Sequence, residues 1–306
     1  GHDLRFNAGA GGSTTTLETA TVLSNTGAVS LGNEAADATV VGGGLDATST
    51  SSTTLGGQLT TEAANGSIDL SAATLASNAS LESGSGAVNL TTVTDGAGSF
   101  DLALQNGTST GTVTATGAVT VDSLTTFDSG YAVNLLGGAT VTQDVNFLNT
   151  GALVLGDAST DTFTFDGGLA TTGNASNPAT VNLAGTISTS ADEMDLGAVT
   201  LDVATTLNTA GGALNVGPVT AGGFDLTLAA GTGSTKLGDA TNSVNGAGTL
   251  TLSSSADTTF DGAVSASTIA LNGTTGQVTF TGDVTATSGL KTTTSVNNVE
   301  FQEDLT

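Results

Sequence analysis

A short pattern of apolar, polar and apolar residues recurs along the chain, and each copy is bounded by Gly, Asn, Asp or Ser. Clear copies are Val29-Ser30-Leu31, Val88-Asn89-Leu90, Phe163-Thr164-Phe165 and Leu250-Thr251-Leu252. Alternation with a period of two places the apolar side chains on one face of a β-strand and the polar ones on the other. Gly and β-branched residues interrupt every window, and no apolar stripe with helical spacing develops. The pattern therefore predicts short strands joined by turns.

A longer repeat is superimposed on this alternation. In its copies, such as Val216-Gly217-Pro218-Val219 and Phe260-Asp261-Gly262-Ala263-Val264, two apolar residues closely flank a Gly. The first apolar residues of successive copies define six structural repeat positions: Leu196, Val216, Leu237, Phe260, Phe280 and Phe301. Successive positions in this series lie about 20 residues apart. The interval from Phe165 to Leu183, which is slightly shorter, is assigned to the same repeat.

A period of about 20 residues lies in the range of solenoid proteins. One turn of this length cannot bury its own apolar face, but the next turn, about 4.8 Å away, supplies hydrogen bonds and apolar contacts. We therefore expect an all-β fold, a parallel β-solenoid with irregular turns of about 20 residues. The repeat is weakest near the start, so residues 1–60 are expected to be a less regular β-repeat and residues 61–306 the solenoid repeats. We also expect the chain to be a fragment of a longer protein.

A row of β-sandwich domains is the rival architecture, because sandwiches also consist of short strands with frequent turns. Sandwiches usually carry a Trp or Tyr core anchor and several Pro, whereas this chain has no Trp, one Tyr and two Pro. Disorder is disfavoured by the low charged fraction of 10% and by the regular apolar positions. The composition favours the solenoid.

The charge of the chain is strongly one-sided. Three basic side chains, Arg5, Lys236 and Lys291, face 28 acidic ones, which gives a net charge of −25. Binding to nucleic acid requires cations that neutralise phosphates, so nucleic acid is excluded as a partner, and so is an anionic membrane surface. No apolar run approaches the roughly 20 residues that cross a bilayer, so no membrane insertion is expected in this segment. The acidic side chains are spread along the chain, and dissolved salt or Ca²⁺ would screen their repulsion. We therefore expect a saline or calcium-containing medium outside the cell.

No catalytic residue is predicted, and the chain is not expected to be an enzyme. Solenoid enzymes that act on polysaccharides combine clustered carboxylates with His, Lys or Arg, whereas here the single His is His2 and the cations are scattered. The densest acidic group contains Asp157, Asp161 and Asp166, and a second one spans residues 192–195. These groups are interpreted either as solvated turn acids, or as a glycosidase pair or weak Ca²⁺ ligands. Apart from Ca²⁺ at turns, no cofactor is expected.

The repeats Gly248–Leu252, Phe260–Val264 and Val278–Val284 resemble the β-strand repeats of giant bacterial surface proteins. They are similar to filamentous haemagglutinin-type adhesins and to the passenger regions of autotransporters. The resemblance implies secretion, a right-handed parallel β-helix and a role in adhesion or matrix building. It carries over no catalytic residue.

The expected function is that of an extracellular structural or adhesive repeat region, which forms a stalk or fibre of a cell-surface or matrix protein. A polysaccharide-active β-helix enzyme and tandem β-sandwich adhesin domains are the alternatives. Strand Thr such as Thr249 and Thr251 would also suit an ice-binding face, although Thr is an ordinary strand residue. Expected partners are further copies joined end to end or neighbouring repeats of a larger chain, and a glycan or other cell-surface ligand.

Overall fold

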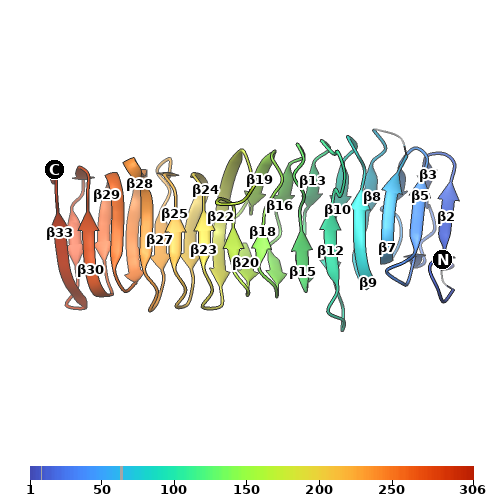
Figure 1. Ribbon diagram of the computed structural model, residues 1–306, viewed down its shortest axis with the longest axis horizontal. Coiled ribbons are helices and arrows are strands. Elements are labelled where there is room, and N and C mark those ends of the chain that lie inside the picture. The colour runs from blue at the N-terminus through green and yellow to red at the C-terminus, as the bar shows by residue number, and fades with distance from the viewer. Residues whose placement is uncertain (8, 63–64) are drawn as a thin grey trace. The chain divides into compact units, whose positions relative to one another are not determined.

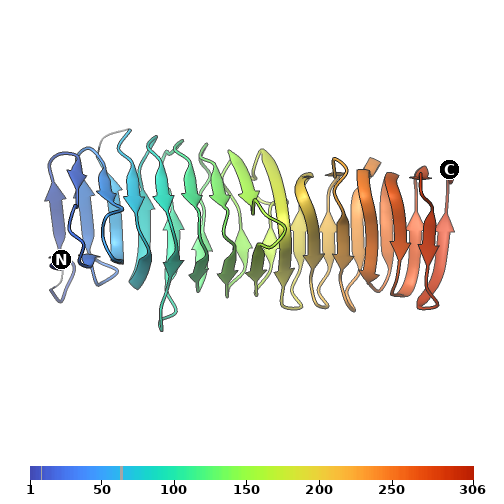
Figure 2. The same ribbon diagram turned by 180° about the vertical axis from the view of Figure 1, so that it is seen from behind.

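The computed structural model describes residues 1–7, 9–62 and 65–306. The chain divides into two compact units. Unit 1 comprises Gly1–Leu153 with Ala175–Ala179, and unit 2 comprises Val154–Asn174 with Thr180–Thr306. The regular elements of the described residues are 33 β-strands, without a helix. Figures 1 and 2 show the strands of successive windings lying side by side within each unit.

Unit 1 winds through three parallel ladders of strands, so that one winding contributes a strand to each ladder. Ladder I contains β1 (Leu4–Phe6), β4 (Val29–Leu31), β7 (Thr53–Thr61), β9 (Ala73–Glu82), β11 (Val93–Thr94), β14 (Val119–Val121) and β17 (Ala139–Val141). Ladder II contains β2 (Thr14–Leu17), β5 (Ala38–Val41), the second halves of β7 and β9, β12 (Asp101–Leu104) and β15 (Ser123–Thr125). Ladder III contains β3 (Thr21–Val22), β6 (Leu45–Ala47), β8 (Ile68–Leu70), β10 (Val88–Leu90), β13 (Val113–Ala115) and β16 (Val133–Leu135). Two further strands follow along the chain, β18 (Val145–Asn146) and β19 (Ala152–Leu155), and the limit between the two units falls within β19.

Unit 2 has the same three-sided winding. Ladder IV contains β20 (Thr162–Phe165), β22 (Thr180–Thr189), β24 (Val199–Asn208), β27 (Leu226–Ala229), β28 (Thr235–Ser254), β29 (Thr258–Leu271) and β32 (Leu290–Thr292). Ladder V contains β21 (Leu169–Ala170), β23 (Met194–Leu196), β25 (Leu214–Val216), the starts of β28 and β29, β30 (Thr274–Phe280) and β33 (Val296–Phe301). Ladder VI contains the starts of β22 and β24, β26 (Val219–Thr220), the middle parts of β28 and β29, and β31 (Val284–Ala286).

The predicted fold class is confirmed, because all the printed strand pairs are parallel and join one winding to the next. Sandwich domains would instead pair antiparallel strands within two packed sheets, so the tandem-sandwich alternative is wrong. The windings differ in length, since the one from Val29 to its partner Thr53 is longer than the one from Thr53 to its partner Ala73. The expected limit between residues 60 and 61 falls within β7.

Each strand buries alternate side chains, as the sequence pattern predicts. In β10, Val88 and Leu90 are buried and Asn89 is exposed. Val88 lies between Ile68 and Val113 of the neighbouring windings, so that like side chains stack in the interior. A winding therefore covers the apolar row of the winding before it, which no three-residue strand achieves alone.

The six repeat positions lie in one continuous column of ladder V. Leu196 pairs with Val216, Val216 with Leu237, and the series continues through the three Phe residues to Phe301. The ring centroids of Phe260 and Phe280 are 4.7 Å apart, and those of Phe280 and Phe301 are 5.0 Å apart. These rings are stacked in parallel, with interplanar angles of 6° and 4°.

The interval from Phe165 to Leu183 is not a winding. Phe165 pairs with Thr189 in ladder IV, whereas Leu183 pairs with Leu201 in ladder VI. The two residues belong to different sides of the winding, because β21 of ladder V lies between the strands that carry them. The spacing alone therefore misassigned this pair.

Candidate functional site

Asp161, one of the three Ca²⁺ candidates, closes a corner loop of unit 2. Its Oδ2 atom accepts hydrogen bonds from the backbone N–H groups of Asp157 and Ala158, both at 2.9 Å. The backbone N–H of Asp161 donates in turn to the carbonyl oxygen of Ala158 at 3.1 Å. The carboxylate thus satisfies the amides of its own loop, which is a structural role.

Asp166 lies beyond the end of β20, where its Oδ1 atom accepts a hydrogen bond from the Ser190 hydroxyl at 2.5 Å. Over the described part of the chain, no three or more His, Cys, Asp or Glu side chains are grouped so that they could hold a metal ion. The structure therefore places Asp157 and Asp161 in one corner loop and Asp166 in a separate interaction with Ser190, and Ca²⁺ at the turns stays a prediction.

The loop closed by Asp161 is one of three related corners, which we call acid-closed corners. They are Leu31–Asp37, Leu155–Asp161 and 237–242, and all three begin with Leu-Gly. Their glycines, Gly32, Gly156 and Gly238, have φ angles of 82°, 86° and 92°. A carboxylate accepts backbone N–H groups within each loop. Within unit 2, the corner at Asp161 leads from β19 into ladder IV, whereas the corner at Asp239 leads from ladder V into ladder VI, so the module does not belong to one side of the winding.

Asp37 is the most strongly held of these carboxylates. It accepts backbone N–H groups from Asn33 at 2.9 Å, Glu34 at 3.1 Å and Ser13 at 2.9 Å. These hydrogen bonds, led by the one from Asn33, lower the pKa of Asp37 to about 2 although burial opposes them. In the third corner, the N–H groups of Asn242 and Thr241 lower the pKa of Asp239. Carboxylates held in this way stay ionised and are poor general acids.

A glycine of the following winding passes over each acid-closed corner. Gly57, Gly185 and Gly262 have φ angles of 74°, 79° and 102°. A Cβ atom on them would lie 2.1 Å, 2.3 Å and 2.4 Å from the carbonyl oxygens of the residues below, which are Asp37, Asp161 and Asp239 respectively. The backbones can approach this closely only because the side chain is absent. The sequence alone did not predict these pairs of an acid-closed corner and a glycine. Each Leu-Gly corner is nevertheless followed by such a glycine one winding later.

Tyr131 is a buried polar side chain at a corner of unit 1. Its hydroxyl donates to the carbonyl oxygen of Leu104 at 3.0 Å and accepts the backbone N–H of Phe127 at 2.8 Å. Burial raises the pKa of Tyr131 to about 12. The hydroxyl therefore remains protonated and connects two windings.

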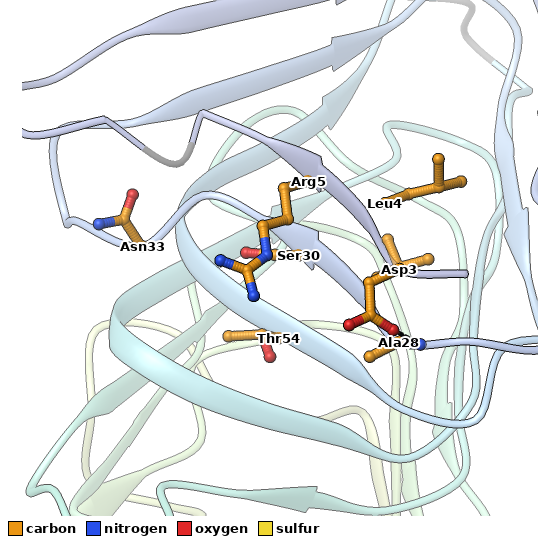
Figure 3. Close-up of a pocket in the computed structure, with 8 residues that line it drawn as sticks. Asp3, Leu4, Arg5, Ala28, Ser30, Asn33 and Thr54 are labelled. Carbon is orange, nitrogen blue, oxygen red and sulfur yellow. Dashed lines mark hydrogen bonds between the residues drawn. The ribbon is translucent and has the colours of Figure 1, made fainter. Parts of the chain in front are cut away.

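Unit 1 has concave sites on its surface. A pocket of about 320 Å³ is lined by Asp3, Arg5, Ser30 and Thr54, among others. Arg5, Ser30 and Thr54 are in register on successive windings, and Figure 3 shows the Arg5 guanidinium group near Ser30 and Thr54. A second pocket, of about 360 Å³, contains a pair in which the Asn78 amide donates to Asp101 at 2.8 Å.

A larger groove, of about 570 Å³, lies on unit 2 at the corner between ladders V and VI. It contains Lys236, whose Nζ atom lies 3.7 Å from the Asp261 carboxylate. It also contains Asp195, a member of the second acidic group in the sequence. Burial, and secondarily the charge of Glu193, raise the pKa of Asp195. The side chains of this groove come from different windings and are far apart in sequence, so only the register of the windings brings them together.

No helix in residues 1–7, 9–62 and 65–306 combines the length and apolar character needed to span a bilayer. The resemblance to surface adhesins rests on the repeat units quoted above, and the fold is compatible with it. Comparison with protein-family models, with curated proteins and with solved structures found no match, so the resemblance stays a prediction.

Proposed function

We propose that the chain is an extracellular structural or adhesive repeat region, which forms part of a stalk or fibre of a cell-surface or matrix protein. The observation that supports this most is the column from Leu196 to Phe301, in which each winding covers the apolar side chain of the next. Such a fold gains stability from every added winding and needs no separate core. Further windings of the same kind can therefore be added to lengthen it, which is what a stalk requires.

The charge supports an exterior location. A net charge of −25 keeps neighbouring molecules apart at low salt, and this repulsion is screened in a saline medium. The exposed positions of the strands carry mainly Thr, Ser, Asn and Asp, as in β10 with Asn89. A surface of this kind is hydrated and resists collapse onto itself.

We further propose that the winding continues beyond the described strands. In the part of the chain described here, β1 pairs with β4 and β33 pairs with β30. The other edge of each strand can accept a further winding, either from the rest of a longer chain or from a second copy. Sedimentation velocity and negative-stain microscopy over a range of concentrations test the second route. Strictly monomeric particles at all concentrations would contradict association between copies.

The location is tested by antibodies raised against this chain. We expect them to label intact, unpermeabilised cells or the material around them, and we expect protease added outside the cells to remove the signal. A cytoplasmic protein with a similar abundance serves as the control. Labelling that requires permeabilisation would contradict the proposal.

A further inference from the structure

The groove of unit 2, which we call the corner groove, is lined by residues of four successive windings, from Thr172 to Asp239, and the last three of these windings form most of it. One wall is the outward row of ladder V, in which Asp195 pairs with Asn215 and Asn215 with Lys236. Neighbouring windings are about 4.8 Å apart, so this wall presents a carboxylate, an amide and an ammonium group at regular intervals over about 10 Å. Because the three side chains come from consecutive strands, a ligand that lies along the groove meets all three.

The floor of the corner groove is made of backbone. Gly197 and Gly217 each begin a two-residue corner between ladders V and VI. A Cβ atom on Gly217 would lie 2.8 Å from the carbonyl carbon of Gly197. The corners stack tightly for this reason, and no side chain rises from these two positions to fill the groove.

The groove ends at an acid-closed corner. At the last of these windings the corner is longer, and Asp239 holds its loop by accepting the N–H groups of Thr241 at 2.8 Å and Asn242 at 3.0 Å. Asp239 itself lines the groove. The long loop therefore forms a fixed end wall with a negative charge, which the two-residue corners lack.

The charges of the corner groove favour a cationic ligand. Asp195 and Asp239 line it, and Glu193 is close enough to raise the pKa of Asp195. The single cation of the wall, Lys236, is partly balanced by Asp261 on the next winding. Glu193 also accepts a hydrogen bond from the Asn215 amide at 2.6 Å, which orients that amide. A carboxylate that is partly desolvated gains from a protonated amine beside it.

We propose that the corner groove binds a protonated primary amine carried on a short hydroxylated chain, that is, an amino-sugar oligomer of two or three units. The amine pairs with the Asp195 carboxylate, and the hydroxyl groups exchange hydrogen bonds with Asn215 and Asp239. A volume of about 570 Å³ is in the range of small-molecule sites, and about 10 Å of wall matches two or three sugar rings. This site is independent of the stalk role, which requires no ligand.

Isothermal titration of the full chain with a three-unit glucosamine oligomer, at about pH 6 and about 0.15 M salt, tests the proposal. We expect one site in unit 2, and we expect Asp195→Asn to weaken binding about tenfold or more, since it removes the ion pair. The matched control is Asp283→Asn, which removes one exposed carboxylate of the same unit away from the groove. A second variant, Ala198→Phe, starts from an exposed groove residue and should block the site without changing any charge.

The fully N-acetylated oligomer separates the amine from the sugar ring. It has the same ring and linkage but no positive charge, so we expect it to bind at least about tenfold more weakly. Equal binding of the two oligomers would overturn the assignment to an amine. Equal weakening by Asp195→Asn and Asp283→Asn, or no effect of Ala198→Phe, would show general attraction to an acidic surface and would overturn the site. Thermal unfolding of each variant shows that a loss of binding does not come from a loss of folding.

Discussion

At the residue scale, the corners of this protein depend on a carboxylate and a glycine that lie on neighbouring windings. In the corner closed by Asp37, the carboxylate accepts hydrogen bonds from the backbone N–H groups of Asn33 and Glu34, which lie in the loop and not in a strand. Gly57 of the following winding then rests on the Asp37 carbonyl oxygen, where a Cβ atom would lie 2.1 Å away. One residue satisfies the hydrogen bonds of the loop, and the other lets the next winding approach. The two requirements are separate, so each can be tested by itself.

We expect Asp37→Asn to destabilise the chain above about pH 4 and to lose this effect in acid. The pKa of Asp37 in the folded chain is about 2, which is below its ordinary value of 3.8. A depressed pKa means that the ionised group contributes stability above the unfolded pKa, and that this contribution disappears as the pH falls through the folded pKa. Urea unfolding of both proteins between about pH 6 and about pH 2 measures the difference. A difference that is constant over this range would contradict the role of the charge.

We expect Gly185→Ala to destabilise unit 2 more than Gly246→Ala does. Both glycines have positive φ angles, of 79° and 70°, so both substitutions incur the backbone cost of about 1–2 kcal/mol for an L-residue. At Gly185 the new Cβ atom would also lie 2.3 Å from the carbonyl oxygen of Asp161, whereas nothing lies within 4 Å at Gly246. Denaturant unfolding of the two variants gives the comparison. Equal losses would mean that the close approach of the windings adds nothing.

At the element scale, the strands are too short to be stable alone, and the columns of stacked side chains hold them. The strands β23 and β25 have three residues each, and each buries two side chains. A strand of this length makes few hydrogen bonds, so its position depends on the winding on either side. The column of Phe260, Phe280 and Phe301 is the clearest case, because the same ring recurs at each level.

We expect Phe280→Ala to cost about 3–5 kcal/mol, because it removes a fully buried ring that stacks on two others. Phe224→Ala is the matched control, since Phe224 is 40% exposed and should change stability by less than about 0.5 kcal/mol. Denaturant unfolding of both variants measures the two losses. A small loss at Phe280 would show that the column does not hold its windings together.

The sequence predicts these columns where successive windings are similar in length. Between Leu196 and Phe301 the spacing of about 20 residues places all six repeat positions in one ladder. A similar spacing fails for Phe165 and Leu183, because one winding has three sides and any of them can carry an apolar alternation. The corners themselves vary, from the short one at Gly197 to the long loop 32–37. A count of residues therefore gives the period but not the side of the winding.

At the scale of the whole molecule, the net charge of the surface can be predicted from the sequence. The side chains that meet on the surface cannot, because they depend on the register of the windings. The excess of acid is visible in the composition and predicts that nucleic acid is not a partner. The carboxylates that are dense in sequence, such as Asp157 and Asp161, proved to belong to their own loop, which Asp161 closes. By contrast, Asp195, Asn215 and Lys236 meet only because the windings are in register. A site made from one residue per winding leaves no local motif, so the structure is needed to find it.

The one-sided charge leads to a prediction for the stability of the chain as a whole. The 28 acidic side chains face three basic ones, so repulsion between carboxylates on neighbouring windings opposes folding at low salt. At about 0.5 M salt the Debye length falls to about 4 Å, which is less than the distance between windings, so this repulsion is largely screened. The unfolding temperature should therefore rise as NaCl is increased from about 0.01 M to about 0.5 M. A protein of similar size and balanced charge provides the control. If the unfolding temperature does not change, the carboxylates must already be spaced widely enough for water to screen them, and the acidic surface then serves solubility alone.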